Sequence, residues 1–158
     1  MSVAELLQRA RQGGMRIATA ESCTGGLLAG ALTEIPGSSD VFERGFVTYS
    51  NLAKSELLGV DMTLIDAHGA VSTEVARAMV KGALARSDAH LAVSITGVAG
   101  PGGTQAKPEG MVCFGIGTMR GDEAIISDRT RLFGAIGRAK VREASVQQAV
   151  DLLLRCLG

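Results

Sequence analysis

The feature that most constrains the fold of this sequence is a strand, a turn and a helix in immediate succession. Residues 15–19 are predicted to form a strand, and residues 27–32 are an apolar segment predicted to form a helix. The turn between them is polar and ends in Gly25 and Gly26. Such junctions are typical of α/β proteins. We therefore expect a hydroxyl-bearing turn at the carboxyl edge of a sheet.

Ser22 and Thr24 supply the hydroxyl groups of this turn. The first backbone N–H groups of a helix have no partner within that helix, so they favour an anion or a carbonyl oxygen that gains negative charge during acyl transfer. A structural role is the alternative, in which either hydroxyl caps the helix and the glycines permit tight packing. The segment alone leaves both interpretations open.

The composition indicates a single domain over residues 1–158. Hydrophobic residues make up 46% of the chain but aromatic residues only 3%, so the core must be built mainly from aliphatic side chains. The 21 glycines cluster at the ends of apolar runs, which predicts many strand–helix junctions rather than flexible linkers. A chain of this length can bury a substantial core.

Apolar periodicity predicts helices that alternate with strands, followed by a hairpin. The clearest helix follows Ser72 and has one apolar stripe, and the Gly121 turn between two apolar runs predicts the hairpin. Ser50 or Asn51 is expected to cap a short helix. This order favours a three-layer α/β/α sandwich with a mixed, mainly parallel sheet and a late β-hairpin. Further helices are expected at residues 3–10 and 138–157, and further strands at residues 45–49, 91–95, 111–118 and 124–133.

Charge, cysteine and histidine content argue against several classes of protein. Lys plus Arg and Asp plus Glu number 16 each, and there are one Tyr and four Phe, so nucleic acid is not the expected ligand. Three scattered cysteines and two isolated histidines predict neither a disulfide framework nor a metal site, and no cofactor is expected. The amino terminus has no signal-peptide pattern and no apolar run reaches membrane-spanning length, so we expect a cytoplasmic protein without membrane association.

Lys54 follows a predicted strand that ends at Tyr49, the only tyrosine, and lies one helical turn beyond the expected helix cap. The positive end of the helix dipole and partial burial both disfavour the ammonium form of a lysine at this position. A neutral amine there could act as the base for a serine hydroxyl. Most lysines are solvated surface residues, and that alternative stays open.

Two further segments offer groups that bind anions. The glycine-rich loop in the middle of the chain contains Thr96, Gly97 and Gly100, and its backbone N–H groups could bind phosphate or carboxylate. It lacks the Walker pattern, and an ordinary flexible loop is the alternative. Arg138 and Arg142 lie four residues apart at the start of the last helix, where they could grip a phosphate together or form part of a solvated face.

Taken together, these segments resemble the C-terminal domain of the competence/damage-inducible protein CinA, a family whose members include nicotinamide mononucleotide (NMN) deamidases. The resemblance covers nearly the whole chain. Because the nucleotide-hydrolysing amino-terminal domain of many relatives has no counterpart here, the free-standing form is expected. The resemblance rests on several long motifs in the same order, at residues 20–26, 42–51 with Lys54, 68–72 and 94–101.

The resemblance implies hydrolysis of the nicotinamide amide of NMN to nicotinic acid mononucleotide and ammonia, a reaction of pyridine nucleotide salvage. It implies that Ser22 is the nucleophile, that Lys54 is its base and that Tyr49 assists proton transfer or orientation. Arg138 would contact the ligand through its phosphate. Substrate binding is implied for the remaining matched positions, which are Thr24, Gly25, Gly26, Thr96, Gly97 and Gly100.

One segment departs from the family pattern. Relatives usually carry Gly-Asp-Arg before the last helix, whereas residues 133–138 read Phe-Gly-Ala-Ile-Gly-Arg. The acidic residue is missing, and Arg138 is the position that matches best.

Alternatives exist for the nucleophile and for the function. Cys23 is a rival to Ser22, but the sequence supplies no imidazole to activate it. A nucleotide- or phosphate-binding regulatory module without catalysis is one alternative function, and an amidohydrolase for another small amide is a second. A homo-oligomer, dimeric or larger, is expected, because small α/β enzymes commonly form symmetric dimers and the apolar hairpin strands need covering.

Overall fold

A five-stranded mixed sheet forms the middle of the molecule. A computed structural model describes residues 2–158, and in it the strands run in the order β2-β1-β3-β4-β5. β1 pairs in parallel with β2 and β3, whereas β3–β4 and β4–β5 are antiparallel pairs. The predicted mixed sheet with a late hairpin is therefore confirmed. The strands are β1 (Ile17–Glu21), β2 (Phe42–Val47), β3 (Leu91–Gly97), β4 (Met111–Arg120) and β5 (Glu123–Leu132).

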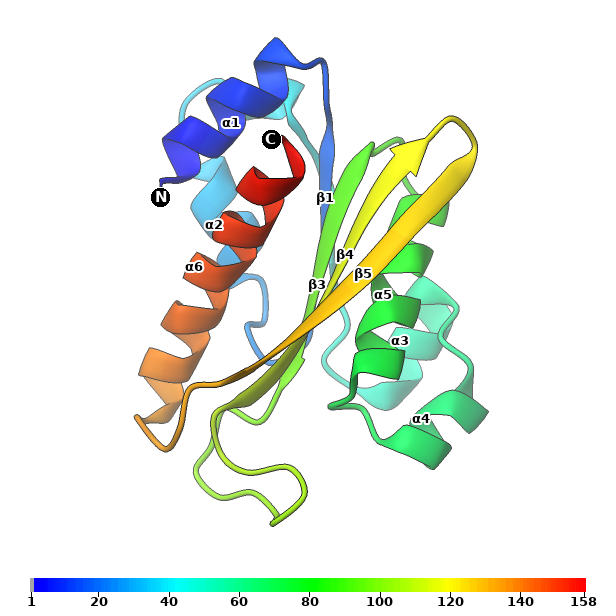
Figure 1. Cartoon of the computed structure of the whole chain (residues 1–158), viewed down its shortest axis with the longest axis vertical. Coiled ribbons are helices and arrows are strands. Elements are labelled where there is room, and N and C mark those ends of the chain that lie inside the picture. The colour runs from blue at the N-terminus through cyan, green and yellow to red at the C-terminus, as the bar shows by residue number, and fades with distance from the viewer. Residues whose placement is uncertain (1) are drawn as a thin grey trace.

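Helices cover both faces of this sheet, which confirms the predicted three-layer sandwich. One layer contains α1, α2 and α6, and the opposite layer contains α3, α4 and α5 (Figure 1). A short 3-10 helix, η1 (Ser38–Asp40), leads into β2. The α-helices are α1 (Val3–Gln12), α2 (Leu27–Thr33), α3 (Asn51–Leu58), α4 (Met62–His68), α5 (Thr73–Ala85) and α6 (Arg138–Cys156).

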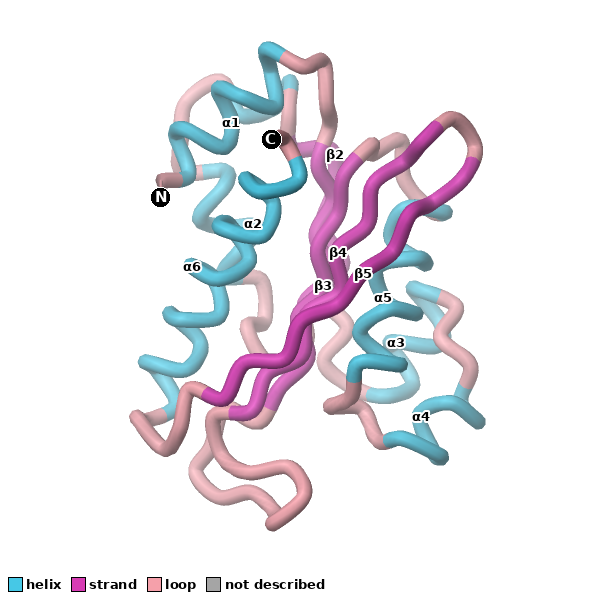
Figure 2. The backbone as a smooth tube through the Cα atoms, in the orientation of Figure 1, coloured by secondary structure: helices cyan, strands magenta, loops and turns pink. Residues whose placement is uncertain are grey.

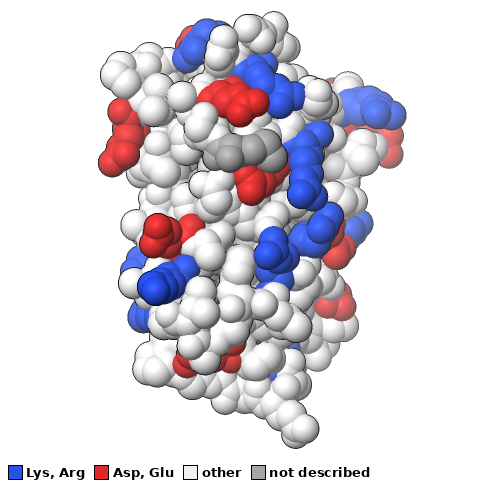
Figure 3. Space-filling view, turned by 60° about the vertical axis from the view of Figure 1, so that its left-hand side comes forward, with Lys and Arg blue, Asp and Glu red and all other residues white. Residues whose placement is uncertain are grey.

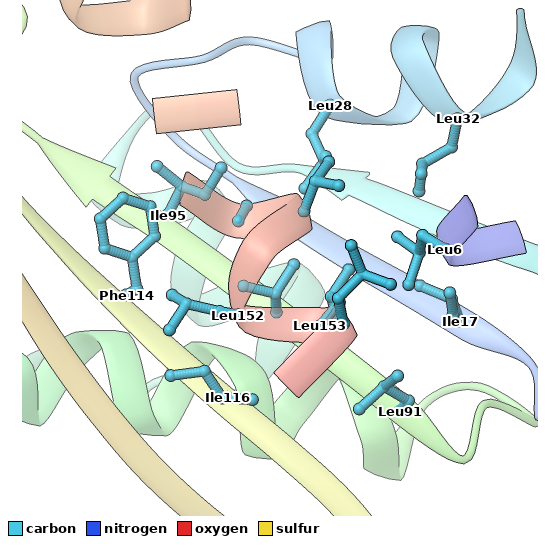
Figure 4. Close-up of a cluster of buried hydrophobic side chains, with 14 of the residues drawn as sticks. Leu6, Ile17, Leu28, Leu32, Leu91, Ile95, Phe114, Ile116, Leu152 and Leu153 are labelled. Carbon is cyan, nitrogen blue, oxygen red and sulfur yellow. The ribbon is translucent and has the colours of Figure 1, made fainter. Parts of the chain in front are cut away.

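Aliphatic side chains fill the space between each helical layer and the sheet, as the composition predicts. On the α6 side, Leu6, Leu153 and Ile17 come together with side chains of β3 and β4 (Figure 4). On the α5 side, Val75, Met79 and their neighbours pack on the other face. Each fully buried side chain of this size stabilises the fold by about 1.5–3 kcal/mol. The central strands β1 and β3 are buried along nearly their whole length, which is typical of strands covered on both faces.

Two glycines allow α5 to approach its neighbours closely. A Cβ atom at Gly82 would overlap the carbonyl oxygen of Leu58 in α3, and one at Gly115 in β4 would overlap the carbonyl oxygen of Ala76 in α5. Any side chain at these positions would force the backbones apart. These glycines therefore set how closely α5 packs against α3 and the sheet. The position of Lys54 in α3 depends on that spacing.

The structure differs from the predicted elements in three places. β1 spans Ile17–Glu21, two residues later than the predicted residues 15–19, because its extent is set by pairing with β2 and β3. β2 begins at Phe42 and ends at Val47, earlier than the predicted residues 45–49, because its extent is set by pairing with β1 rather than by its own apolar pattern. α4 was not predicted, since its seven residues form only about two helical turns, which is too short for apolar periodicity to indicate a helix. Its signal was the Asp61 carboxylate, which accepts a hydrogen bond from the backbone N–H of Thr63 (2.9 Å) and so caps the helix.

The carboxyl ends of the three parallel strands meet at one edge of the sheet. The loop of residues 98–110, which leaves β3, extends from this same edge (Figure 2). No helix within residues 2–158 has the length and apolar character that a membrane span requires. In open α/β sheets, ligands bind outside the carboxyl ends of the strands, so this edge is where a site is expected.

Candidate active site

Ser22 lies at the carboxyl end of β1, the centre of this edge. Its backbone N–H donates to the carbonyl oxygen of Ile95 (2.9 Å), and this bond continues the pairing of β1 with β3 by one residue. On the other side, the N–H of Thr48 donates to the carbonyl oxygen of Glu21 (2.8 Å). Ser22 is thus held between two neighbouring chain segments, with 8% of its surface exposed.

The hydroxyl groups of the turn do not cap α2, so the structural alternative for Ser22 and Thr24 is not observed. The N-cap residue is Gly26, which makes no side-chain hydrogen bond. Instead, the buried Glu21 carboxylate accepts hydrogen bonds from the N–H groups of Leu28 (2.9 Å) and Ala29 (3.1 Å). A carboxylate satisfies the helix terminus better than a hydroxyl does. The Ser22 hydroxyl is consequently left for another partner.

That partner is the Lys54 amine. Ser50 begins α3 by accepting a hydrogen bond from the N–H of Ala53 (3.0 Å), which places Lys54 in the first helical turn. Its side chain reaches back toward the sheet, where Nζ lies 3.0 Å from Ser22 Oγ. Nζ also donates to the carbonyl oxygens of Thr48 (2.9 Å), Tyr49 (3.4 Å) and Ser50 (3.5 Å). The fold therefore brings together two residues that are 32 positions apart in the sequence.

The burial of Lys54 shifts the equilibrium of its amine toward the neutral form. The residue is only 1% exposed, and this burial lowers the pKa of the Lys54 amine below its ordinary value. Burial has the opposite effect on the neighbouring thiol, because it raises the pKa of Cys23 to about 11. At neutral pH the thiol is therefore protonated and unreactive, which weakens the case for Cys23 as a rival nucleophile.

A cavity of about 260 Å³ opens beside the Ser22–Lys54 pair. Its far wall is the turn before α5, which is held in place because Thr96 Oγ1 donates to the carbonyl oxygen of Ala70 (2.8 Å). Six residues singled out from the sequence line this cavity: Ser22, Tyr49, Lys54, Thr96, Gly97 and Arg138. Cys23, Asn51, Ala70, Val71 and Ala99 complete the lining.

Arg138 forms the rim of the cavity. Its Nη1 donates to the carbonyl oxygen of Gly100 (2.7 Å), and its Nη2 donates to the hydroxyl oxygen of Tyr49 (2.9 Å). Arg138 and Tyr49 are both exposed, so a ligand that enters the cavity passes them first. The unusual segment before Arg138 thus still delivers a guanidinium group to this edge of the sheet.

The other predicted residues lie outside the lining. Gly100 contributes only the carbonyl oxygen that holds Arg138. Thr24, Gly25 and Gly26 form the turn next to Ser22 but do not line the cavity. The sequence suggested Asn51 only as an alternative cap of a short helix, and the structure places it in the cavity lining.

A larger groove elsewhere in the molecule is less suited to chemistry. It measures about 620 Å³ and lies between α1, α2 and α6, away from Ser22. Its lining is largely apolar, and Lys140 and Glu143 are its charged members.

On the face that carries these helices, Lys and Arg side chains are interspersed with Asp and Glu (Figure 3). Within residues 2–158, no three His, Cys, Asp or Glu side chains are grouped as metal ligands.

Known proteins of one family match nearly the whole chain. The family model of the CinA C-terminal domain matches residues 2–157. CinA-like proteins of Mycolicibacterium paratuberculosis and Mycobacterium tuberculosis are each 54% identical, and the matches cover 91% and 92% of this chain but 33% of each relative. The chain therefore spans about a third of the length of these curated relatives.

Solved structures of the same superfamily share the fold. Competence/damage inducible protein CihA from Agrobacterium tumefaciens superposes with a TM-score of 0.89 at 44% identity, over 97% of this chain and 94% of that chain. A CinA superfamily protein from Escherichia coli gives a TM-score of 0.90 at 34% identity, over 98% and 87% of the two chains. Sequence and fold agree, and this chain belongs to the CinA C-terminal domain family.

Proposed function

We propose that this chain hydrolyses the carboxamide of NMN, with Ser22 as nucleophile and Lys54 as general base. The observation that carries the proposal is the 3.0 Å contact between Ser22 Oγ and the Nζ atom of a fully buried lysine. A buried amine that is neutral at working pH can take the proton of a serine hydroxyl, which is otherwise a weak nucleophile. Membership of a family that includes amidases supports the same conclusion.

In the proposed first half-reaction, Ser22 Oγ attacks the amide carbon while its proton passes to Lys54 Nζ. The carbonyl electron pair moves to oxygen and forms an oxyanion. Collapse of this intermediate breaks the C–N bond, and the proton on Lys54 passes to the departing nitrogen, which leaves as ammonia. The carbonyl oxygens of Thr48, Tyr49 and Ser50 around Nζ stabilise the ammonium between these two transfers.

In the second half-reaction, water attacks the ester formed on Ser22. Lys54 takes the proton of the water and then returns it to Ser22 Oγ as the ester bond breaks. The net reaction converts the amide and one water to a carboxylic acid and ammonia. Enzyme groups return to their starting protonation states, so no metal or cofactor is required by the chemical balance.

Arg138 is proposed to bind the phosphate of the nucleotide. Two of its N–H groups are engaged by Gly100 and Tyr49, and the remaining donors of a guanidinium can bind a phosphate oxygen. Its exposure at the rim suits a phosphate, which is costly to strip of water. With the phosphate at the rim, the nicotinamide end would lie toward Ser22.

The proposal is tested by incubating the purified chain with NMN and measuring ammonia together with nicotinic acid mononucleotide. We expect equal amounts of both products, unchanged by a chelator, and no release from Ser22→Ala with the same thermal unfolding midpoint. A covalent adduct on Ser22 should be detectable by mass spectrometry. NMN binding without release from either chain would instead establish a non-catalytic module, and release of ammonia only from other amides would reassign the substrate.

A further inference from the structure

Arg142, one turn after Arg138 on α6, does not reach toward a ligand but toward the backbone of the turn that follows Ser22. Its Nε atom donates to the carbonyl oxygen of Cys23 (3.1 Å), and its Nη2 atom lies 3.4 Å from the carbonyl oxygen of Thr24. Arg142 is not among the residues that line the cavity. The sequence-based interpretation in which Arg138 and Arg142 grip one phosphate together therefore does not describe this geometry.

The turn held by Arg142 contains backbone donors that pair with no backbone carbonyl. Among the described residues, these are the N–H groups of Cys23, which faces its own thiol, and Thr24, whereas the N–H of Gly25 donates to the carbonyl oxygen of Ser22 (3.0 Å). Unpaired N–H groups next to a nucleophile are the usual donors to the oxyanion of an acyl-transfer intermediate. Such donors contribute most when their direction is fixed before the reaction starts.

Peptide planarity connects Arg142 to the direction of these donors. In a trans peptide unit the C=O and N–H groups point in opposite directions. The unit that carries the Thr24 N–H also carries the Cys23 carbonyl, which Arg142 holds. The unit that carries the Cys23 N–H has the Ser22 carbonyl, which Gly25 holds. Each unpaired N–H is thus oriented through the carbonyl at the other end of its own peptide unit.

The positive charge of Arg142 also favours a negative charge at the turn after Ser22. The Arg142 and Arg138 guanidinium groups both lower the pKa of the Cys23 thiol, although burial outweighs them. A negative charge at this turn is therefore stabilised by two nearby cations. The turn lies directly against the guanidinium, since a Cβ atom at Gly25 would be 3.6 Å from Arg142 Nη2.

We infer that Arg142 is a positioning residue that fixes the Thr24 N–H group as an oxyanion-binding donor beside Ser22. The inference rests on the proposed function, in that it assumes an acyl-transfer reaction at Ser22. It separates the two arginines of α6 into different roles: Arg138 binds the ligand, and Arg142 holds the backbone that stabilises the transition state.

The test compares Arg142→Gln, Arg142→Lys, Arg138→Gln and, as a matched control on the same helix, the exposed Arg155→Gln. Two rates are measured for each folded variant: NMN turnover, and covalent labelling of Ser22 by a fluorophosphonate. In the labelling step the Ser22 Oγ–phosphorus bond forms and the phosphorus–fluorine bond breaks, with the hydroxyl proton taken by Lys54 and fluoride released. Thermal unfolding of every variant reports whether a loss is merely structural.

For Arg142→Gln we expect kcat and the labelling rate to fall together by about 10- to 100-fold, somewhat less than removal of an oxyanion donor itself costs, with KM nearly unchanged. Arg142→Lys should recover part of the loss, because an ammonium keeps the positive charge but lacks the planar fork of donors that a guanidinium presents. Arg138→Gln should instead raise KM for NMN and reduce the labelling rate less than Arg142→Gln does. Arg155→Gln should match the parent in both rates.

Two results would overturn the inference: labelling of Arg142→Gln at the parent rate, or a rise in KM with kcat unchanged, which would make Arg142 a ligand contact. Labelling of the parent chain no faster than that of Ser22→Ala would also overturn it. A parent chain that is labelled at Ser22 in an Arg142-dependent way but does not release ammonia from NMN would support the inference while the proposed substrate fails.

Discussion

Two helix amino termini in this molecule, those of α2 and α3, each contain a buried ionisable side chain. Glu21 precedes α2 and Lys54 lies in the first turn of α3, and each is 1% exposed. The charge of Glu21 is opposite to the partial positive charge of its helix terminus, and its carboxylate binds two helical N–H groups. The charge of Lys54 has the same sign as that of its terminus.

This difference between Glu21 and Lys54 distinguishes a structural buried side chain from a reactive one. Both carboxylate oxygens of Glu21 accept helical N–H groups, so the residue fixes the start of α2. Lys54 is desolvated, its pKa is lowered by burial, and its nearest side-chain group is the Ser22 hydroxyl. Two equally buried side chains thus have different roles. Both helix amino termini are partially positive, so they attract the carboxylate of Glu21 and disfavour the ammonium form of Lys54.

The largest expected effect comes from replacing the base. Lys54→Met keeps a long apolar side chain but removes the amine, so kcat for NMN should fall by about 1,000-fold, within the range that general bases contribute. Steady-state kinetics with Lys81→Met, an exposed lysine of α5, as control checks this result. Retention of more than a tenth of the parent rate by a folded Lys54→Met chain would break the contrast between the two helices.

Replacing the anchor should change stability rather than chemistry. In Glu21→Gln one amide oxygen can still accept an N–H, but the amide nitrogen faces the second helical N–H, so the free energy of unfolding should fall by about 1–3 kcal/mol. Urea unfolding measures this loss, with the exposed Glu34→Gln as control. If Glu21→Gln were as stable as the parent chain but catalytically dead, Glu21 would belong to the chemistry and the comparison would be wrong.

A smaller effect is expected at Tyr49, whose backbone and side chain serve different partners. Its carbonyl oxygen is near Lys54 Nζ and its hydroxyl accepts from Arg138. Tyr49→Phe removes only the hydroxyl, so KM should rise by about 3- to 10-fold, as expected for one exposed charge-assisted hydrogen bond. Because the carbonyl remains, the pH dependence of kcat/KM should not move. A shifted profile would mean that the phenol itself exchanges the proton.

The sequence predicts the parts of this site that depend on local pattern. Ser50 and Ser72 cap α3 and α5 as expected from their types and positions. The turn and helix around Ser22 are where the apolar and glycine pattern indicates, although the strand before them lies two residues later than predicted. The order of strands and helices predicts the three layers. These features are encoded within a few residues, so a single sequence suffices to find them.

Apart from the Ser22–Lys54 pair, which the family resemblance implies, contacts between distant segments could not be predicted. Glu21 caps α2 across seven residues, which is outside the usual capping box. Arg142 reaches the Cys23 carbonyl from a helix 119 residues away, and nothing in the spacing of Arg138 and Arg142 distinguishes their roles. The extent of β2 is likewise set by its pairing with β1. Each depends on how the layers pack, which only the assembled fold determines.

The most direct test of the central claim, that Lys54 acts as a neutral base, is the pH dependence of kcat/KM for NMN. Deprotonation of the Lys54 ammonium creates the base, so activity should rise with pH and level off with a midpoint below 10.5, the ordinary value for lysine. The midpoint should persist in Cys23→Ala, because the thiol titrates only near pH 11. A rise with a midpoint at or above the ordinary lysine value, or one that disappears with Cys23, would contradict the account.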